Sequence, residues 1–203
     1  ITFGQTPATA THILASISSK PLSVIVKSML TDSDNLAANA LLKTLGQQYY
    51  QTSGTWQNGM HAMQHILSND TGIDFNLSLL TDGAGLSRYN LTSPRQLEAL
   101  LQDIDKHPEL RNTIMASLPR PGKEGTLIHR MATTSGNDRI AAKTGSMNGV
   151  NSLMGFIDSQ HNGRLRFVII FNGFVGPSRP YHQFEDQLCA WLINAPRQTP
   201  MSV

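Results

Sequence analysis

Two Asn-Gly pairs near the end of the chain constrain its fold more than any other feature. Asn148-Gly149 and Asn162-Gly163 each separate runs rich in apolar and β-branched residues. An Asn-Gly pair between such runs is the strongest short-range signal for a hairpin turn. The runs 140–144, 150–158 and 164–172 are therefore predicted to be three strands. Because tight turns join antiparallel neighbours, these strands are expected to form a small antiparallel sheet.

Helical periodicity replaces this pattern in the earlier part of the chain. Apolar side chains recur three and four positions apart in five segments, which places them on one face of each predicted helix. The five segments are 21–30, 37–45, 56–67, 94–104 and 110–118. Pro21 is a favourable first helical residue, whereas Gly46 is predicted to end the second helix. The run 12–18 could be a strand that leads into the domain.

A last helix is predicted after the strands, where it would cover the sheet. Its apolar face is formed by Phe184, Leu188, Trp191 and Leu192. Helices followed by an antiparallel sheet and a closing helix indicate an α+β fold. The 203 residues fit a single domain. Its predicted parts are a leading segment (1–20), a mainly helical subdomain (21–135), the strands with their helix (136–194) and a frayed tail (195–203).

Composition argues against several classes of function. The formal net charge is only +2, and no basic stripe accompanies it, so no nucleic-acid partner is predicted. The longest apolar run, 167–171, is far shorter than the roughly 20 residues of a transmembrane helix, so no transmembrane segment is predicted. Cys189 is the only cysteine, which excludes an internal disulfide and a cysteine-based zinc site. The sequence starts at Ile1 without an apolar leader, and a leader is expected to be removed or to lie outside it.

The first hairpin concentrates charge and hydroxyl groups. Lys143, Thr144, Gly145 and Ser146 follow the apolar start of the first strand. On a strand, the lysine and the glycine share one face and the two hydroxyls the other, unless a bend at the glycine turns them. An ammonium, hydroxyl donors and a glycine that permits close approach suit an anion. The alternative is a solvated strand end.

A polar turn joins the first two predicted helices. Ser33, Asp34 and Asn35 lie between them, held from both sides by helical segments. Residues of these types form local hydrogen bonds and favour turns and caps. Ser33 and Asn35 could simply cap the second helix, and Asp34 is better suited to capping than to chemistry.

Two other motifs do not predict a bound ligand. The loop 82–88 lacks the Lys-Ser/Thr ending of a phosphate loop and the spacing of a dinucleotide loop. His61 and His65 lie four apart on a predicted helix, but Ala62 stands where a zinc protease requires Glu. An exposed helix face is therefore the favoured interpretation of the two histidines, and neither a metal nor a cofactor is predicted.

The Ser-Asp-Asn turn and the Lys-Thr-Gly strand together are marks of penicillin-binding proteins and β-lactamases. Three further stretches extend the pattern over most of the chain: Gly54-Thr55-Trp56, Asp82 to Arg88, and Leu118 to Leu127. With them, the sequence resembles the C-terminal part of a class C low-molecular-mass penicillin-binding protein, of the penicillin-binding protein 4 type. Ala84 stands where many members have Ser, a change that removes one hydroxyl and leaves the mechanism intact.

The resemblance implies a transpeptidase-like fold and an activity on the bacterial cell wall. Such an enzyme is a D-alanyl-D-alanine carboxypeptidase and endopeptidase. It cleaves the D-Ala-D-Ala end of peptidoglycan stem peptides, and peptide cross-links, through an acyl-enzyme on a serine that penicillins also acylate. A periplasmic, exported location is implied as well. The expected partners are therefore a stem peptide or a β-lactam, and the oligomeric state is not predicted.

The resemblance also implies roles for individual residues. Ser33 would relay a proton to the leaving D-Ala nitrogen, Asn35 would hold the substrate backbone and orient a lysine, and Lys143 would attract the terminal carboxylate. The groups expected to bind this carboxylate and to form half of the oxyanion hole lie at Thr144, Gly145 and Ser146. The residues expected to line the pocket for the stem-peptide side chain are Leu86, Arg88, Met147 and Asn148. For these last four, core packing or solvent exposure is the alternative.

One element of the family pattern is absent from the 203 residues. The nucleophile belongs to a Ser-x-x-Lys motif, and no serine stands three positions before any lysine. We therefore expect the nucleophile on an upstream segment of the same protein. Two other hypotheses remain at this point: a non-catalytic module that binds cell-wall peptides, and a serine β-lactamase.

Overall fold

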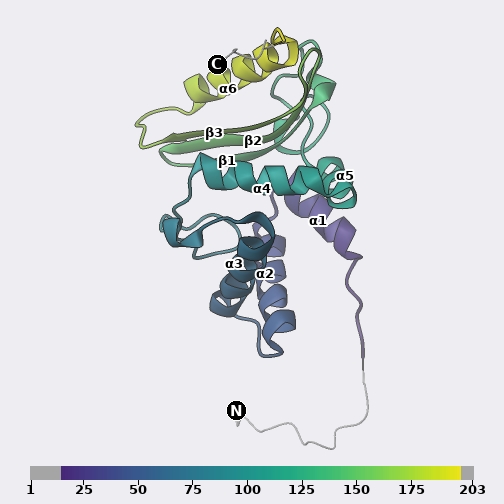
Figure 1. Cartoon of the computed structure of the whole chain (residues 1–203), viewed down its shortest axis with the longest axis vertical. Coiled ribbons are helices and arrows are strands. Elements are labelled where there is room, and N and C mark those ends of the chain that lie inside the picture. The colour runs from purple at the N-terminus through teal and green to yellow at the C-terminus, as the bar shows by residue number, and fades with distance from the viewer. Residues whose placement is uncertain (1–14, 198–203) are drawn as a thin grey trace, which may run out of the picture.

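The computed structural model describes residues 15–197 and combines a helical part with a three-stranded sheet (Figure 1). The helical part contains α1 (Leu22–Thr31), α2 (Asn35–Tyr50), α3 (Trp56–Thr71), α4 (Pro94–Lys106), α5 (Pro108–Ser117) and the 3₁₀ turns η1 (Phe75–Leu77), η2 (Gly125–Leu127) and η3 (Asn137–Arg139). The sheet and its closing helix are β1 (Ile140–Met147), β2 (Val150–Ser159), β3 (Gly163–Asn172) and α6 (Arg179–Asn194). The predicted α+β class is confirmed. No helix within residues 15–197 is long and apolar enough to span a membrane.

The strands pair in the order β1-β2-β3, and both pairings are antiparallel as predicted. Met147 pairs with Val150, so Asn148-Gly149 forms the predicted two-residue turn. The second hairpin differs, because Ser159 pairs with Gly163 and three residues form its loop. Gly163 has a φ of 68°, the left-handed conformation that commonly closes a three-residue hairpin.

Each face of the sheet carries an apolar cluster. Ile140 and Ala142 pack with residues of α6, whereas Ala141 packs with residues of α4. Figure 1 shows α6 and α4 on opposite sides of the sheet. Successive residues of a strand alternate between faces, so the next residue after Ala142, Lys143, points toward the helical part. Packing of the two alanines therefore fixes the direction of the Lys143 side chain, which points toward the helices.

The prediction that Gly46 ends the second helix is wrong. Helix α2 continues to Tyr50 and ends where Gln51 adopts the left-handed conformation. Gly46 is buried against α3, where a Cβ atom on it would collide with the backbone nitrogen of Gly59. This glycine therefore permits close approach of two helices, and the stop signal assigned to it was a packing signal.

The predicted apolar face of α6 is wrong in part. Phe184 and Trp191 are 52% and 56% exposed, whereas Glu185, Cys189 and Ile193 are fully buried. The face is rotated because a buried polar network, described below, holds Glu185 against the sheet.

Two predictions for the ends of the chain also need correction. Residues 15–18, the described part of the run 12–18, belong to no strand, and residues 12–14 lie outside the described residues. Ala195, the first residue of the predicted frayed tail, is buried, and its carbonyl accepts a hydrogen bond of 2.8 Å from the Asn162 amide. Residues 198–203 of that tail lie outside the described residues.

Candidate active site

The turn between α1 and α2 presents Ser33 in an unusual backbone conformation. Its φ is 60°, which a residue with a Cβ atom adopts at a cost of about 1–2 kcal/mol. Asp34 is the residue that caps α2, because its carboxylate accepts a 3.0 Å hydrogen bond from the Ala37 amide. Asn35 is the first residue of α2 and is exposed. The capping alternative for Ser33 is therefore not what the structure shows, and the serine hydroxyl is available for another contact.

That contact is with Lys143 of β1. The lysine Nζ donates a 2.7 Å hydrogen bond to the Ser33 hydroxyl and a 3.0 Å bond to the Thr144 carbonyl. The two segments, 110 positions apart in the sequence, thus meet in the structure. Burial lowers the pKa of the Lys143 ammonium. Both acceptors are neutral oxygens, so they leave its positive charge uncompensated and able to attract an anion.

Strand geometry aims two further donors to the same side of β1. The Ala142 N–H points away from β2, since it donates a 3.1 Å hydrogen bond to the Pro119 carbonyl. In an antiparallel ladder this direction alternates along the strand, so the N–H groups of Thr144 and Ser146 point the same way as that of Ala142. The Ser146 side chain is also exposed. A ligand beside β1 could therefore receive backbone and side-chain hydrogen bonds together.

Gly145 lies against a side chain of the neighbouring strand. It pairs with Ser152, and a Cβ atom on residue 145 would collide with the Ser152 hydroxyl. The glycine therefore makes room for a side chain of the neighbouring strand.

The loop before α4 lies at the turn of the first hairpin. The Arg88 guanidinium donates a 3.4 Å hydrogen bond to the Asn148 carbonyl, which places these two predicted pocket residues together. Leu86 is 53% exposed, and Met147, half-buried, pairs with Val150 beside the turn. These residues form a rim at the end of β1 rather than part of the core.

Two residues for which the sequence predicted no role organise this corner. The Asp82 carboxylate accepts hydrogen bonds of 3.1, 3.0 and 3.2 Å from the backbone of residues 85, 86 and 87, and so shapes the loop. Thr126, in η2, accepts a 2.8 Å hydrogen bond from the Thr144 hydroxyl. An aspartate that opens a glycine-rich loop is a recognisable turn signal, whereas Thr126 is part of the stretch Leu118 to Leu127 without a signal of its own for a role.

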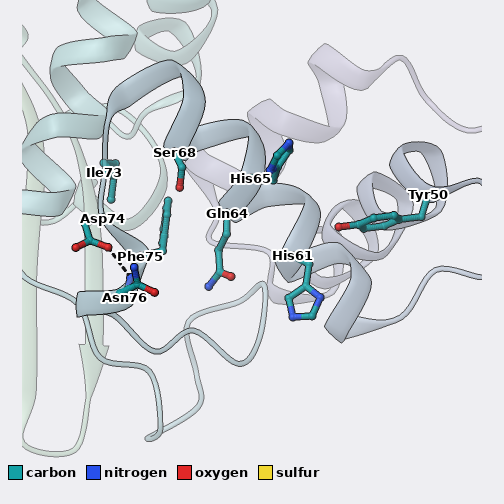
Figure 2. Close-up of a pocket in the computed structure, with 9 residues that line it drawn as sticks. All are labelled: Tyr50, His61, Gln64, His65, Ser68, Ile73, Asp74, Phe75 and Asn76. Carbon is teal, nitrogen blue, oxygen red and sulfur yellow. Dashed lines mark hydrogen bonds between the residues drawn. The ribbon is translucent and has the colours of Figure 1, made fainter.

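His61 and His65 lie elsewhere, at a cavity of about 570 Å³ (Figure 2). Figure 2 shows both on α3, at the opposite end of the cavity from Asp74 and Asn76. None of the cavity residues belongs to the site at Lys143. Within the described part of the chain, no group of three side chains is placed to hold a metal.

Comparisons with known proteins show the family to which the chain belongs. The profile of the D-Ala-D-Ala carboxypeptidase 3 (S13) family matches residues 1–195, and the chain belongs to this family. It is 35% identical over 165 residues to D-alanyl-D-alanine carboxypeptidase DacB of Haemophilus influenzae. The matched region covers 80% of this chain and 34% of that protein. It is 36% identical over 172 residues to a D-alanyl-D-alanine carboxypeptidase of Actinomadura. The matched region covers 82% of this chain and 31% of that protein.

Solved structures extend the comparison. One similar structure is penicillin binding protein 4 (dacB) from Haemophilus influenzae in a complex with a β-lactam. It matches this chain with a TM-score of 0.78 and 34% identity, and the match covers 87% of this chain and 42% of that chain. The TLA-3 extended-spectrum β-lactamase has a TM-score of 0.55 at 15% identity and shares the fold alone. The predicted family and transpeptidase-like fold are thus confirmed. The chain spans about one third of the length of the two curated relatives described above.

Proposed function

We propose that this chain supplies the substrate-binding and proton-transfer half of a serine D-Ala-D-Ala carboxypeptidase that acts on peptidoglycan stem peptides. The observation that carries the proposal is the 2.7 Å contact between the Lys143 amine and the Ser33 hydroxyl. This contact places a cation and a proton-relaying hydroxyl side by side, at the end of a strand with outward-pointing N–H groups. A peptide that ends in a free carboxylate suits this arrangement.

Anion binding is assigned to the end of β1. The ammonium of Lys143 attracts the terminal carboxylate, while the hydroxyls of Thr144 and Ser146 donate hydrogen bonds to it. The Ser146 N–H serves as one donor of the oxyanion hole, because it points away from β2. Gly145 keeps the strand free of a side chain between these donors.

Proton transfer is assigned to Ser33. A hydroxyl has one hydrogen to donate and two lone pairs to accept with, and Ser33 already accepts from Lys143. Its own hydrogen can therefore pass to the D-Ala nitrogen as the peptide C–N bond breaks, while a proton from the attacking serine replaces it. Asn35, one helical position into α2, holds the substrate backbone through its amide.

The attacking serine is assigned to an upstream segment of the same protein. No serine in this sequence stands three residues before a lysine, and the relatives are about three times longer than the matched region. The same proposal includes reaction with β-lactams, a second activity on peptide cross-links, and export to the periplasm. The rim formed by Leu86, Arg88, Met147 and Asn148 is assigned to the stem-peptide side chain.

Covalent labelling with a fluorescent penicillin tests the proposed function. The protein that includes the upstream segment should retain the label after denaturation, since an acyl-enzyme is a covalent ester. Absence of retained label would instead favour a non-catalytic module that binds cell-wall peptides. Rapid turnover of the antibiotic would favour a β-lactamase.

The pH dependence of peptide cleavage should report the Lys143 ammonium. Because burial lowers the pKa of Lys143, the charged form is lost at a lower pH than for a solvated lysine. We therefore expect kcat/KM to fall on the alkaline side with a pKa below the usual lysine value. In Lys143→Arg, a slower enzyme whose guanidinium stays charged, this alkaline fall should disappear. The same fall in the Arg variant would assign it to another group.

A further inference from the structure

Thr126 lies at the corner where the Ser33 turn meets β1. Its hydroxyl is 2.8 Å from the Thr144 hydroxyl, and its side chain is exposed. The residue before it, Gly125, has a φ of 62° and packs so closely on the carbonyl of Thr31 that a Cβ atom there would collide with it. Thr31 ends α1, two positions before Ser33. Thr126 therefore stands next to both elements of the candidate active site.

The backbone around Thr126 is held on both sides. Leu127 is fully buried in the cluster that also contains Ile140 of β1, and its carbonyl accepts a 3.1 Å hydrogen bond from Gly122. On the other side, Thr31 is buried and donates a 2.7 Å hydrogen bond to the Ser117 carbonyl. A surface residue between two such anchors presents its side chain in one place, as a binding residue must.

The hydrogen bond between the two threonines leaves one donor unused. Each hydroxyl carries one hydrogen, and the bond from Thr144 to Thr126 uses one of the two. The Thr126 hydrogen is then free to point into the site. Since the oxygens are 2.8 Å apart, both hydroxyls can reach the same carboxylate group, which accepts several hydrogen bonds at once.

We propose that Thr126 is a further ligand of the substrate's terminal carboxylate and a determinant of the preference for a free acid end. This inference rests on the proposed function and adds to it a residue from a different segment of the chain. In the free protein the two threonines bond to each other. In the complex, Thr126 and Thr144 each direct a hydrogen to the carboxylate, beside the Lys143 ammonium.

The test is a comparison of an N-acyl-D-Ala-D-Ala peptide with its C-terminal amide. Each peptide is titrated into the protein that includes the upstream segment, with its nucleophilic serine replaced by Ala so that the peptide stays intact, and binding is followed by NMR. The wild-type chain should bind the acid more tightly than the amide. In Thr126→Val, which keeps the shape and loses the hydroxyl, affinity for the acid should fall about ten- to a hundredfold while affinity for the amide changes little.

Two controls separate the possible outcomes. Thr126→Ser should restore the preference for the acid, because it returns the hydroxyl. Equal weakening of both peptides by Thr126→Val would indicate a structural role and overturn the inference. If the wild-type chain shows no preference for the acid, the carboxylate site of the proposed function fails. If the wild type prefers the acid and Thr126→Val keeps that preference, only the role of Thr126 fails.

Discussion

Replacing Lys143 by Ala should slow acylation by penicillin about a hundred- to a thousandfold, in the protein that includes the nucleophile. The substitution removes the ammonium that contacts the Ser33 hydroxyl at 2.7 Å, and with it the charge that attracts the carboxylate common to stem peptides and penicillins. Loss of one preorganised donor from such a site has an effect of this size. The measurement is the rate of covalent labelling at fixed penicillin concentration.

The same substitution should leave the fold intact. Burial disfavours the charged form of Lys143, as the direction of its pKa shows, so at neutral pH its removal eliminates an unfavourable desolvation and stability should not fall. Lys123→Ala, an exposed lysine in the bend that precedes η2, is the matched control and should acylate normally. A Lys143→Ala protein that is labelled at the wild-type rate would contradict the assignment of Lys143.

Glu185→Ala should lower the free energy of unfolding by about 1–3 kcal/mol. Its carboxylate is fully buried, 2.9 Å from the Arg130 guanidinium, and accepts a 2.8 Å hydrogen bond from the Asn151 amide. The Asn151 oxygen in turn lies 2.8 Å from Nε2 of His182. In the variant Arg130 keeps its 2.6 Å contact with Asp186, but the Asn151 amide loses its acceptor in a buried place, and the expected loss is the free energy of leaving that group without a hydrogen bond. Urea denaturation at neutral pH measures it.

The control for this variant lies on the same helix. Gln187 is exposed, and Gln187→Ala should change the free energy of unfolding by no more than about 0.5 kcal/mol. Burial raises the pKa of Glu185, while the contacts with Arg130 and Asn151 lower it. A loss below about 1 kcal/mol in Glu185→Ala would mean that the network contributes little and that another cause orients α6.

The same network shows why part of the fold could not be predicted from local patterns. Periodicity located α6 correctly but placed Phe184 and Trp191 in the core. Glu185 occupies the buried face because Arg130 lies beside it, 55 positions away in the sequence. Gly46 was misinterpreted for a similar reason, since only contact with α3 explains it. The strands were predictable because an Asn-Gly turn and alternating burial are local properties.

The candidate site, like the fold, could be predicted from the sequence only in part. Each of its two main segments could be located from the sequence, but their contact depends on packing between α1, η2 and β1. Lys143 points toward the helical part because Ala141 and Ala142 fix the alternation of the strand. Thr126 lies in the stretch Leu118 to Leu127 that contributes to the resemblance, but no role could be assigned to it, because only the neighbouring hydroxyl of Thr144 shows what it contacts.

A double-mutant cycle between Ser33→Ala and Lys143→Ala tests most directly whether the two segments act as one site. The measured quantity is the rate of acylation by penicillin for the wild type, both single variants and the double variant. If the hydroxyl and the amine work as a unit, the double variant should be about as slow as the slower single variant. Losses that multiply would show that Ser33 and Lys143 act independently, and would contradict the account.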